Sequence, residues 1–208
     1  MDSNKWTEYQ YEQPSGLTGR KRLKKEYQDE YDVVWTDGLN KEYVYVGSWY
    51  RVDMDDEIYG IFWKRQLGMG LLSLALFAVP ALLDCQGAFH LYFMFPYIAA
   101  IVFALLTFIE IITCPKHAGR MEHMFYDENY GKREKYATIT PPLSALAALT
   151  ALVAIFVDGV ATDLLQYVSV LALAADAVLQ YYLLKMMRDL PIKREINERV
   201  KALMEKQE

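Results

Sequence analysis

Apolar and charged positions divide this chain into long alternating blocks. A hydrocarbon core of roughly 30 Å is crossed by about 20 helical residues, with a working range of about 17 to 25. Four apolar runs at or close to this length, nearly free of charged residues, lie around Leu67–Leu83, Phe89–Ile112, Leu143–Val157 and Leu164–Leu184. The pattern therefore predicts four transmembrane helices, at about residues 66–83, 89–112, 141–157 and 164–184.

The ends of two spans carry additional signals. Tyr59, Phe62 and Trp63 precede the first span and are suited to the headgroup layer. The third apolar run is the shortest, and Pro141 and Pro142 precede it. Because proline is tolerated in the first turn of a helix, we expect this span to begin at Pro141. The predicted fold class is thus an all-α integral membrane protein with an antiparallel four-helix bundle.

Residues 1–65 form an aromatic N-terminal region, which we expect to be a small head. Two β-rich segments, Val33–Trp35 and Tyr43–Val46, flank the turn signal Asp37–Gly38 and predict a β-hairpin. An isolated hairpin is marginally stable in water, so it should rest on another surface. Acidic residues at 53–57 then favour the start of a helix that runs through Trp63 into the first span.

Two further segments outside the spans show helical spacing. In the inner loop, 113–140, the stripe His117, Met121, Met124 and Phe125 predicts a helix that ends near Asn129 and Gly131. Residues 185–208 form the C-terminal segment, where a narrow apolar line predicts an amphipathic helix suited to docking on the head or a partner: Ile192, Ile196, Val200 and Leu203.

The distribution of charge sets the expected orientation. The 22 Lys and Arg residues against 27 Asp and Glu give a net charge of -5, which excludes a strongly basic nucleic-acid binder. Ten basic residues precede the first span, five lie between the second and third, and seven follow the fourth. Lys and Arg are retained on the cytoplasmic side, so both termini should be cytoplasmic, with the plasma membrane as the expected location. The short outer turns, 84–88 and 158–163, leave no extracytoplasmic ligand domain.

This one-sided distribution also bears on transport. Small carriers that insert in both directions need balanced Lys and Arg, which this chain lacks. Its two hairpins share one topology, so they cannot form an inverted repeat. The alternating-access design is therefore disfavoured.

Asp176 is the main candidate for intramembrane chemistry, because an acidic residue deep in a span is costly. Counting 1.5 Å per residue from the inner ends places Asp176 at roughly 12 Å, Ser73 at about 10 Å and Thr150 at about 13 Å. Gln180 shares the face of Asp176, so these four residues form a candidate polar site. It would bind a proton or a cation, or alternatively fix the register of the helices by hydrogen bonds.

Other chemistry has little support in the sequence. Cys114, His117 and His123 are weak candidates for metal ligands, because a paired Cys-x-x-Cys and a His-Glu-x-x-His motif are both missing. Cys85 and Cys114 fall at opposite ends of the first helical hairpin and cannot form a disulfide. Phosphate-binding loops and nucleophile elbows are also missing, so neither a cofactor nor an enzyme site is predicted.

The expected function is that of a multi-pass membrane accessory or scaffold protein, embedded in the lipid bilayer and bound to a protein partner or to further copies of itself. The candidate docking residues are Trp35, Tyr43, Tyr45, Trp49, Ile196, Val200 and Leu203. The alternative is an oligomeric ion- or proton-coupled transporter or channel subunit that uses Asp176. A lipid-modifying enzyme with interfacial histidines is a distant third.

Overall fold

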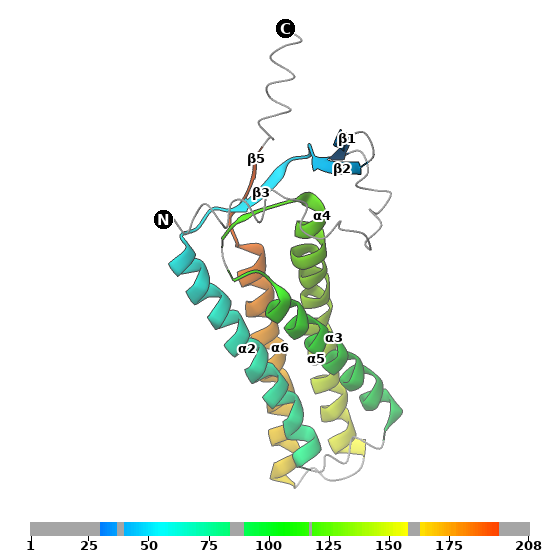
Figure 1. Cartoon of the computed structure of the whole chain (residues 1–208). Coiled ribbons are helices and arrows are strands. Elements are labelled where there is room, and N and C mark those ends of the chain that lie inside the picture. Colours follow the sequence, from blue (N-terminus) through cyan, green and yellow to red (C-terminus); the bar gives the residue numbers. More distant parts are fainter. Residues whose placement is uncertain (1–29, 37–39, 84–89, 117, 158–162, 196–208) are drawn as a thin grey trace. The chain divides into compact units, whose positions relative to one another are not determined.

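The computed structural model describes residues 30–36, 40–83, 90–116, 118–157 and 163–195 (Figure 1). The chain forms two compact units, each built from segments that are distant in sequence. One unit, here called the head, comprises Met1–Tyr59, His117–Glu128 and Pro191–Glu208. The other, the helical unit, comprises Gly60–Lys116 and Asn129–Leu190. The head therefore draws on the inner loop and the C-terminal segment as well as the N-terminal region.

Four long helices dominate the chain: α2 (Asp56–Leu82), α3 (Leu91–Thr113), α5 (Lys132–Val157) and α6 (Leu164–Arg188). By length and composition, each belongs to a helix that could cross a membrane, as the apolar runs predict. Asp56 and Glu57 occupy the first turn of α2, which continues through Trp63 as expected. The Asp163 side chain caps α6 by accepting a hydrogen bond from the Leu165 backbone N–H at 3.0 Å.

Helix α5 lies at the centre of the helical unit and packs closely against both α3 and α6. Its buried face consists largely of alanine and serine, which let helix backbones approach: Ala137, Ser144, Ala147, Ala148, Ala151 and Ala154. Helix α2 is joined to the others by side chains. For example, the Trp63 indole N–H donates to the Ile111 carbonyl at 2.9 Å, and the Tyr97 hydroxyl donates to the Phe77 carbonyl at 2.5 Å.

The third predicted span begins earlier than expected. Helix α5 starts at Lys132, so Pro141 and Pro142 lie inside the helix and not in its first turn. They remove the backbone donors to the carbonyls of Ala137 and Thr138, which apolar helices tolerate when neighbouring groups compensate. The predicted helix end at Asn129 and Gly131 is also wrong. A π-helical turn, Asp127–Gly131, joins the short helix α4 (His123–Tyr126) to α5.

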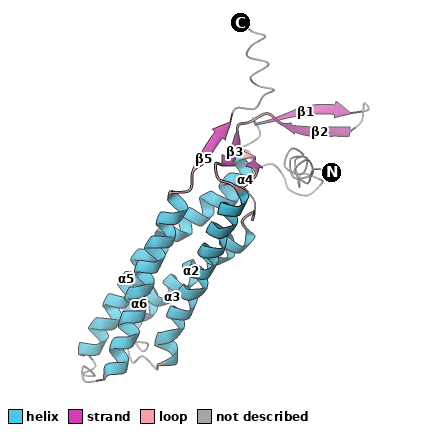
Figure 2. Ribbon diagram, turned by 90° about the vertical axis from the view of Figure 1, so that its left-hand side faces the viewer, coloured by secondary structure: helices cyan, strands magenta, loops and turns pink. Residues whose placement is uncertain are grey.

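The head contains two small sheets (Figure 2). Strands β1 (Tyr31–Thr36) and β2 (Asn40–Tyr45) form the predicted hairpin, with Tyr31 opposite Tyr45 and Thr36 opposite Asn40. The second sheet has the order β4-β3-β5, with β3 (Trp49–Val52) in the centre. Its antiparallel neighbours are β4 (Arg120–Met121) and β5 (Ile192–Glu195).

This sheet corrects two predictions. Ile192 belongs to strand β5 and not to an amphipathic helix, because the segment pairs with β3 directly after Pro191, a residue that cannot extend a helical hydrogen-bond ladder. Met121 likewise belongs to β4 and not to a helical stripe. The rest of the predicted C-terminal helix, 196–208, lies outside the described residues.

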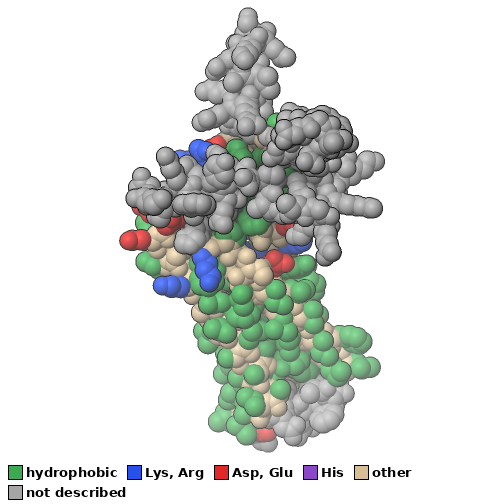
Figure 3. Space-filling view, viewed as in Figure 1, with side chains coloured by type: hydrophobic (Ala, Val, Ile, Leu, Met, Phe, Trp, Pro, Cys, Tyr) green, Lys and Arg blue, Asp and Glu red, His purple; other side chains and the backbone are tan. Residues whose placement is uncertain are grey.

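Apolar side chains cover the outward faces of the long helices. Figure 3 shows hydrophobic side chains over most of the visible face of α2 and α3. Large exposed examples occur on all four helices, including Leu72, Phe95, Phe156 and Leu171, with 52%, 71%, 65% and 67% of their surface accessible. Apolar surface of this extent is unusual for a protein surrounded by water.

Candidate functional site

The intramembrane candidate Asp176 lies in a hydrogen-bonded network inside the helical unit, with none of its surface accessible. The Ser73 hydroxyl of α2 donates to Asp176 Oδ1 at 2.6 Å, and the Ser144 hydroxyl of α5 lies 2.8 Å from Oδ2. The Gln180 amide, one turn along α6, donates to Ser73 Oγ at 2.6 Å. The network therefore ties α2, α5 and α6 together around one carboxyl group.

Ser144 lets this network accommodate either protonation state of Asp176. A hydroxyl has one proton to donate, and Ser144 Oγ lies near two acceptors, Asp176 Oδ2 at 2.8 Å and the Thr140 carbonyl at 3.1 Å. With an ionised carboxylate, Ser144 donates to Asp176. With a neutral carboxyl group, Asp176 donates to Ser144, which turns to the Thr140 carbonyl. The chain itself thus supplies a partner for both carboxyl oxygens in either state.

The structure brings together three of the four residues proposed for the polar site: Asp176, Gln180 and Ser73. It does not place Thr150 there. The Thr150 hydroxyl donates within its own helix, at 2.9 Å from the Leu146 carbonyl and 3.0 Å from that of Ala147. Ser144 takes the expected position, although the prediction from sequence did not include it in the polar site. Ser144 and Thr150 lie on different faces of α5, since helical residues six positions apart do not share a face.

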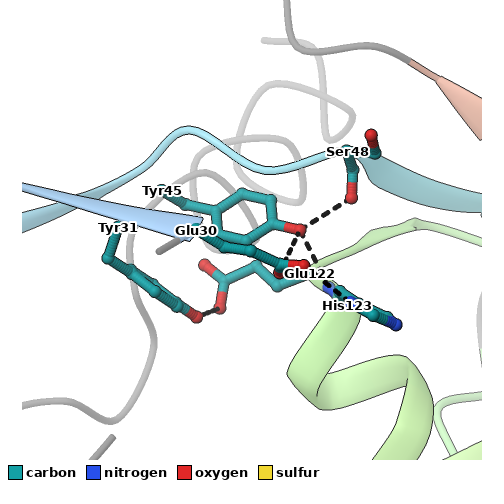
Figure 4. A network of polar contacts seen from close by, with 6 residues as sticks. All are labelled: Glu30, Tyr31, Tyr45, Ser48, Glu122 and His123. Atoms are coloured by element: carbon teal, nitrogen blue, oxygen red, sulfur yellow. Dashed lines mark hydrogen bonds and ion pairs between the residues drawn. The ribbon is translucent and has the colours of Figure 1, made fainter. Parts of the chain in front are cut away.

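The head contains a second polar network, drawn in Figure 4. The Tyr31 hydroxyl donates to Glu122 Oε2 at 2.7 Å, and His123 Nδ1 lies 2.7 Å from Glu30 Oε1. The Tyr45 hydroxyl donates to the Ser48 carbonyl at 2.7 Å and accepts from the His123 backbone N–H at 3.1 Å. These contacts join the N-terminal segment to the segment around α4.

Burial shifts the acid–base behaviour of this network. Desolvation, reinforced by the hydrogen bond with Glu122, raises the pKa of Tyr31 well above its ordinary value. Desolvation also raises the pKa of Tyr45, against a lowering contribution from the His123 backbone. The pKa of Glu122 is raised because its carboxyl group is desolvated, although the Tyr31 hydrogen bond partly offsets this effect. The two tyrosines therefore remain neutral hydrogen-bond donors at neutral pH.

We predict that Glu122→Gln stabilises the head at pH 7 and has little effect at pH 4. Because the pKa of Glu122 is raised on folding, the folded head binds this proton more tightly than the unfolded chain does. The free energy of unfolding therefore falls as the pH rises from the ordinary value of 4.5 through the raised pKa. Glutamine does not ionise, so the free energy of unfolding of the variant lacks this decrease with pH. Thermal unfolding at each pH, followed by tryptophan fluorescence, measures the difference, since Trp49 packs against Tyr45.

Glu57→Gln is the control for that experiment, because Glu57 is an exposed carboxylate in the first turn of α2. Glu57→Gln should not raise the unfolding temperature of the head at pH 7. Equal unfolding temperatures for Glu122→Gln and the parent protein across pH 4 to 8 would contradict the proposed cost of ionising Glu122.

One of the candidate docking residues, Tyr45, lies in the core of the head, and Trp49 packs against that core. Tyr45 is buried between Tyr31 and Trp49, with ring centroids 5.1 and 5.0 Å away, and Trp49 is partly buried. In the register of the hairpin, Trp35 pairs with Lys41 and Tyr43 pairs with Val33. The other three, Ile196, Val200 and Leu203, lie outside the described residues.

The weak metal candidates are distributed over several environments. Cys114 is buried at the end of α3, and His123 belongs to the head network. His117 lies outside the described residues. Over the described ranges, no group of three or more His, Cys, Asp or Glu side chains is arranged to hold a metal ion.

No known protein family, curated protein or solved structure matches this chain.

Proposed function

We propose that this chain is a multi-pass membrane accessory protein that presents its head, together with the segment after β5, to a protein partner. The observation that carries the proposal is the sheet β4-β3-β5. Its strands come from the segment before α2, the segment between α3 and α5, and the segment after α6. All regions outside the long helices, apart from their two short connections, thus contribute to one folded unit.

The sheet supports the expected topology independently of charge. Strands that pair in one sheet must lie on the same side of a membrane, so both ends of the chain and the inner loop would share a side. Four membrane crossings meet this requirement. The Lys and Arg residues, which gather in the same segments, make that side the cytoplasm, with the plasma membrane as the proposed location.

The network around Asp176 favours a structural role for this residue. Both of its oxygens have partners within the chain, and those partners come from two other helices. A buried acid whose hydrogen bonds are satisfied by the protein fixes the register of helices without needing a transported ion. This supports an accessory role, in which the long helices anchor the head in the bilayer.

The alternative is an ion- or proton-coupled transporter or channel subunit built on Asp176. What favours it is a pair of buried polar atoms on α6, Ser169 Oγ and Gln180 Oε1, which find no hydrogen-bond partner in the described parts of the chain. They lie on the same face as Asp176, seven residues before it and four after it. An ion pathway along α6 would use such atoms.

Two variants separate these functions. In Asp176→Asn, we expect an unchanged amount of partner on purification in mild detergent, because asparagine can keep the hydrogen bonds to Ser73 and Ser144. A chain that ends at Glu195 should lose partner. This truncation is preferable to a cut at Leu190, which would also remove strand β5.

The transporter alternative predicts the reverse result. Reconstituted Asp176→Asn would lose an ion flux that the parent protein shows, while the chain ending at Glu195 would retain it. Such a result would overturn the accessory proposal.

A further inference from the structure

A buried arginine that forms no ion pair with any described residue lies in the helical unit. Arg133, in the first turn of α5, has 2% of its surface accessible. Its Nη1 donates to Gln66 Oε1 of α2 at 3.1 Å, and its guanidinium lies 4.8 Å from the centre of the Tyr130 ring. Within the described residues, Arg133 forms no ion pair with a carboxylate. By sequence alone, Arg133 is only one of the five basic residues between the second and third spans.

Arg133 and Gln66 have further hydrogen-bonding capacity that the described part of the chain does not use. Arg133 Nε and Gln66 Nε2 are both buried, and neither N–H group meets an acceptor among the residues that the structure describes. Gln66 has none of its surface accessible. A buried charge that lacks a partner is strongly unfavourable, and the Tyr130 ring compensates only part of it. Two unused donors beside one uncompensated positive charge form a site that is complementary to an oxyanion.

The surrounding charges favour the same class of ligand. Basic residues next to this pair, on the exposed or half-exposed surface of α2 and α5, are Lys64, Arg65, Lys132 and Lys135. The neighbouring acid Glu134 is already paired with Arg188, at 3.0 Å. The planar fork of arginine suits phosphate oxygens, and basic sites between helices at the cytoplasmic end of a bundle recruit anionic headgroups.

We propose that Arg133 and Gln66 bind the phosphate group of an anionic phospholipid. The Arg133 guanidinium supplies the positive charge and one hydrogen-bond donor, Nε–H. The Gln66 side-chain amide supplies a second donor from another helix. The phosphate itself would be held by these two side chains, with the surrounding basic residues adding favourable charge. A lipid as its source rests on the membrane insertion proposed above.

Gln66→Glu is the sharpest test, because it places a carboxylate of nearly the same shape beside Arg133. This internal acid would compensate the arginine and compete with the phosphate. The full chain would be purified in phosphate-free maltoside micelles, and helix unfolding would be followed by circular dichroism. The additions would be phosphatidylglycerol, diacylglycerol as the phosphate-free lipid, or inorganic phosphate.

For the parent protein, we expect saturating phosphatidylglycerol to raise the unfolding temperature by about 5 °C or more, and diacylglycerol to leave it unchanged. Without lipid, Gln66→Glu should unfold at a higher temperature than the parent protein. Adding the lipid should not raise that unfolding temperature further. Arg133→Gln should bind the lipid about tenfold more weakly or worse. Lys185→Gln, which removes an exposed charge from the last turn of α6 and lies outside the proposed site, should respond as the parent does.

Equal lipid responses in Gln66→Glu and the parent would overturn the site, and this variant answers the question even if Arg133→Gln does not fold. An equal gain from diacylglycerol would also overturn it. A gain from inorganic phosphate but not from phosphatidylglycerol would retain the phosphate site and exclude a lipid as its source. None of these measurements requires a protein partner, so they remain informative if the accessory function fails.

Discussion

Arg51→Pro is expected to unfold the head and abolish partner binding, while the long helices remain folded. Arg51 lies in β3, the central strand, opposite Arg120 of β4 and Lys193 of β5. Proline cannot donate a hydrogen bond to either neighbour and is found almost only in edge strands. We expect a loss of about 3 kcal/mol in the stability of the head. Tryptophan fluorescence and limited proteolysis measure this loss, and circular dichroism reports on the helices.

Arg51→Ala is the matched control, because the Arg51 side chain is exposed and its removal leaves the backbone donor in place. It should retain both a folded head and the partner. Partner binding that survives in Arg51→Pro after the head has unfolded would show that the head does not carry the interaction.

Asp176→Leu is expected to destabilise the helical unit by about 2–4 kcal/mol. Leucine removes the acceptor of the Ser73 hydroxyl in a fully buried site, and Ser144 keeps only its contact with the Thr140 carbonyl. Because α2 is joined to the other helices through side chains, it should be the first helix to separate. Unfolding in mixed micelles with increasing denaturing detergent, followed by circular dichroism, measures the loss.

Asp176→Asn provides the comparison. Its side-chain oxygen can accept from Ser73, and its amide can donate to Ser144, which then donates to Thr140. We therefore expect a loss below about 1 kcal/mol, since hydrogen bonds inside membrane proteins contribute modestly. Equal destabilisation by leucine and asparagine would contradict the view that these hydrogen bonds hold α2, α5 and α6 in register.

The elements that sequence predicts best are those set by local pattern. Four apolar runs give four long helices, and two β-rich segments around Asp37–Gly38 give the hairpin. The pattern of apolar, polar and turn residues within each segment is enough to determine such elements. Regular helix geometry likewise placed Gln180 on the face of Asp176, and Ser73 at a similar depth in its own span.

The failures concern contacts between distant segments. Ile192 begins the helically spaced apolar line that continues at Ile196, yet it lies in strand β5, which pairs with β3 about 140 positions earlier. Tertiary pairing overrides a local preference of this kind. Arg133 is an ordinary loop charge in the sequence, yet the early start of α5 buries it beside Gln66. Ser144 and Thr150 are equally polar, and only the packing of α5 against α6 decides which of them meets Asp176.

The accessory function is tested most directly by brief crosslinking in native membranes, followed by purification and mass spectrometry that identifies and counts the bound proteins. We predict one second protein in fixed stoichiometry, with crosslinks from the head or from residues 196–208 and none from the outer turns. Recovery of this chain alone, or only as a homo-oligomer, would contradict the account. That result would make an Asp176-dependent flux the function to measure.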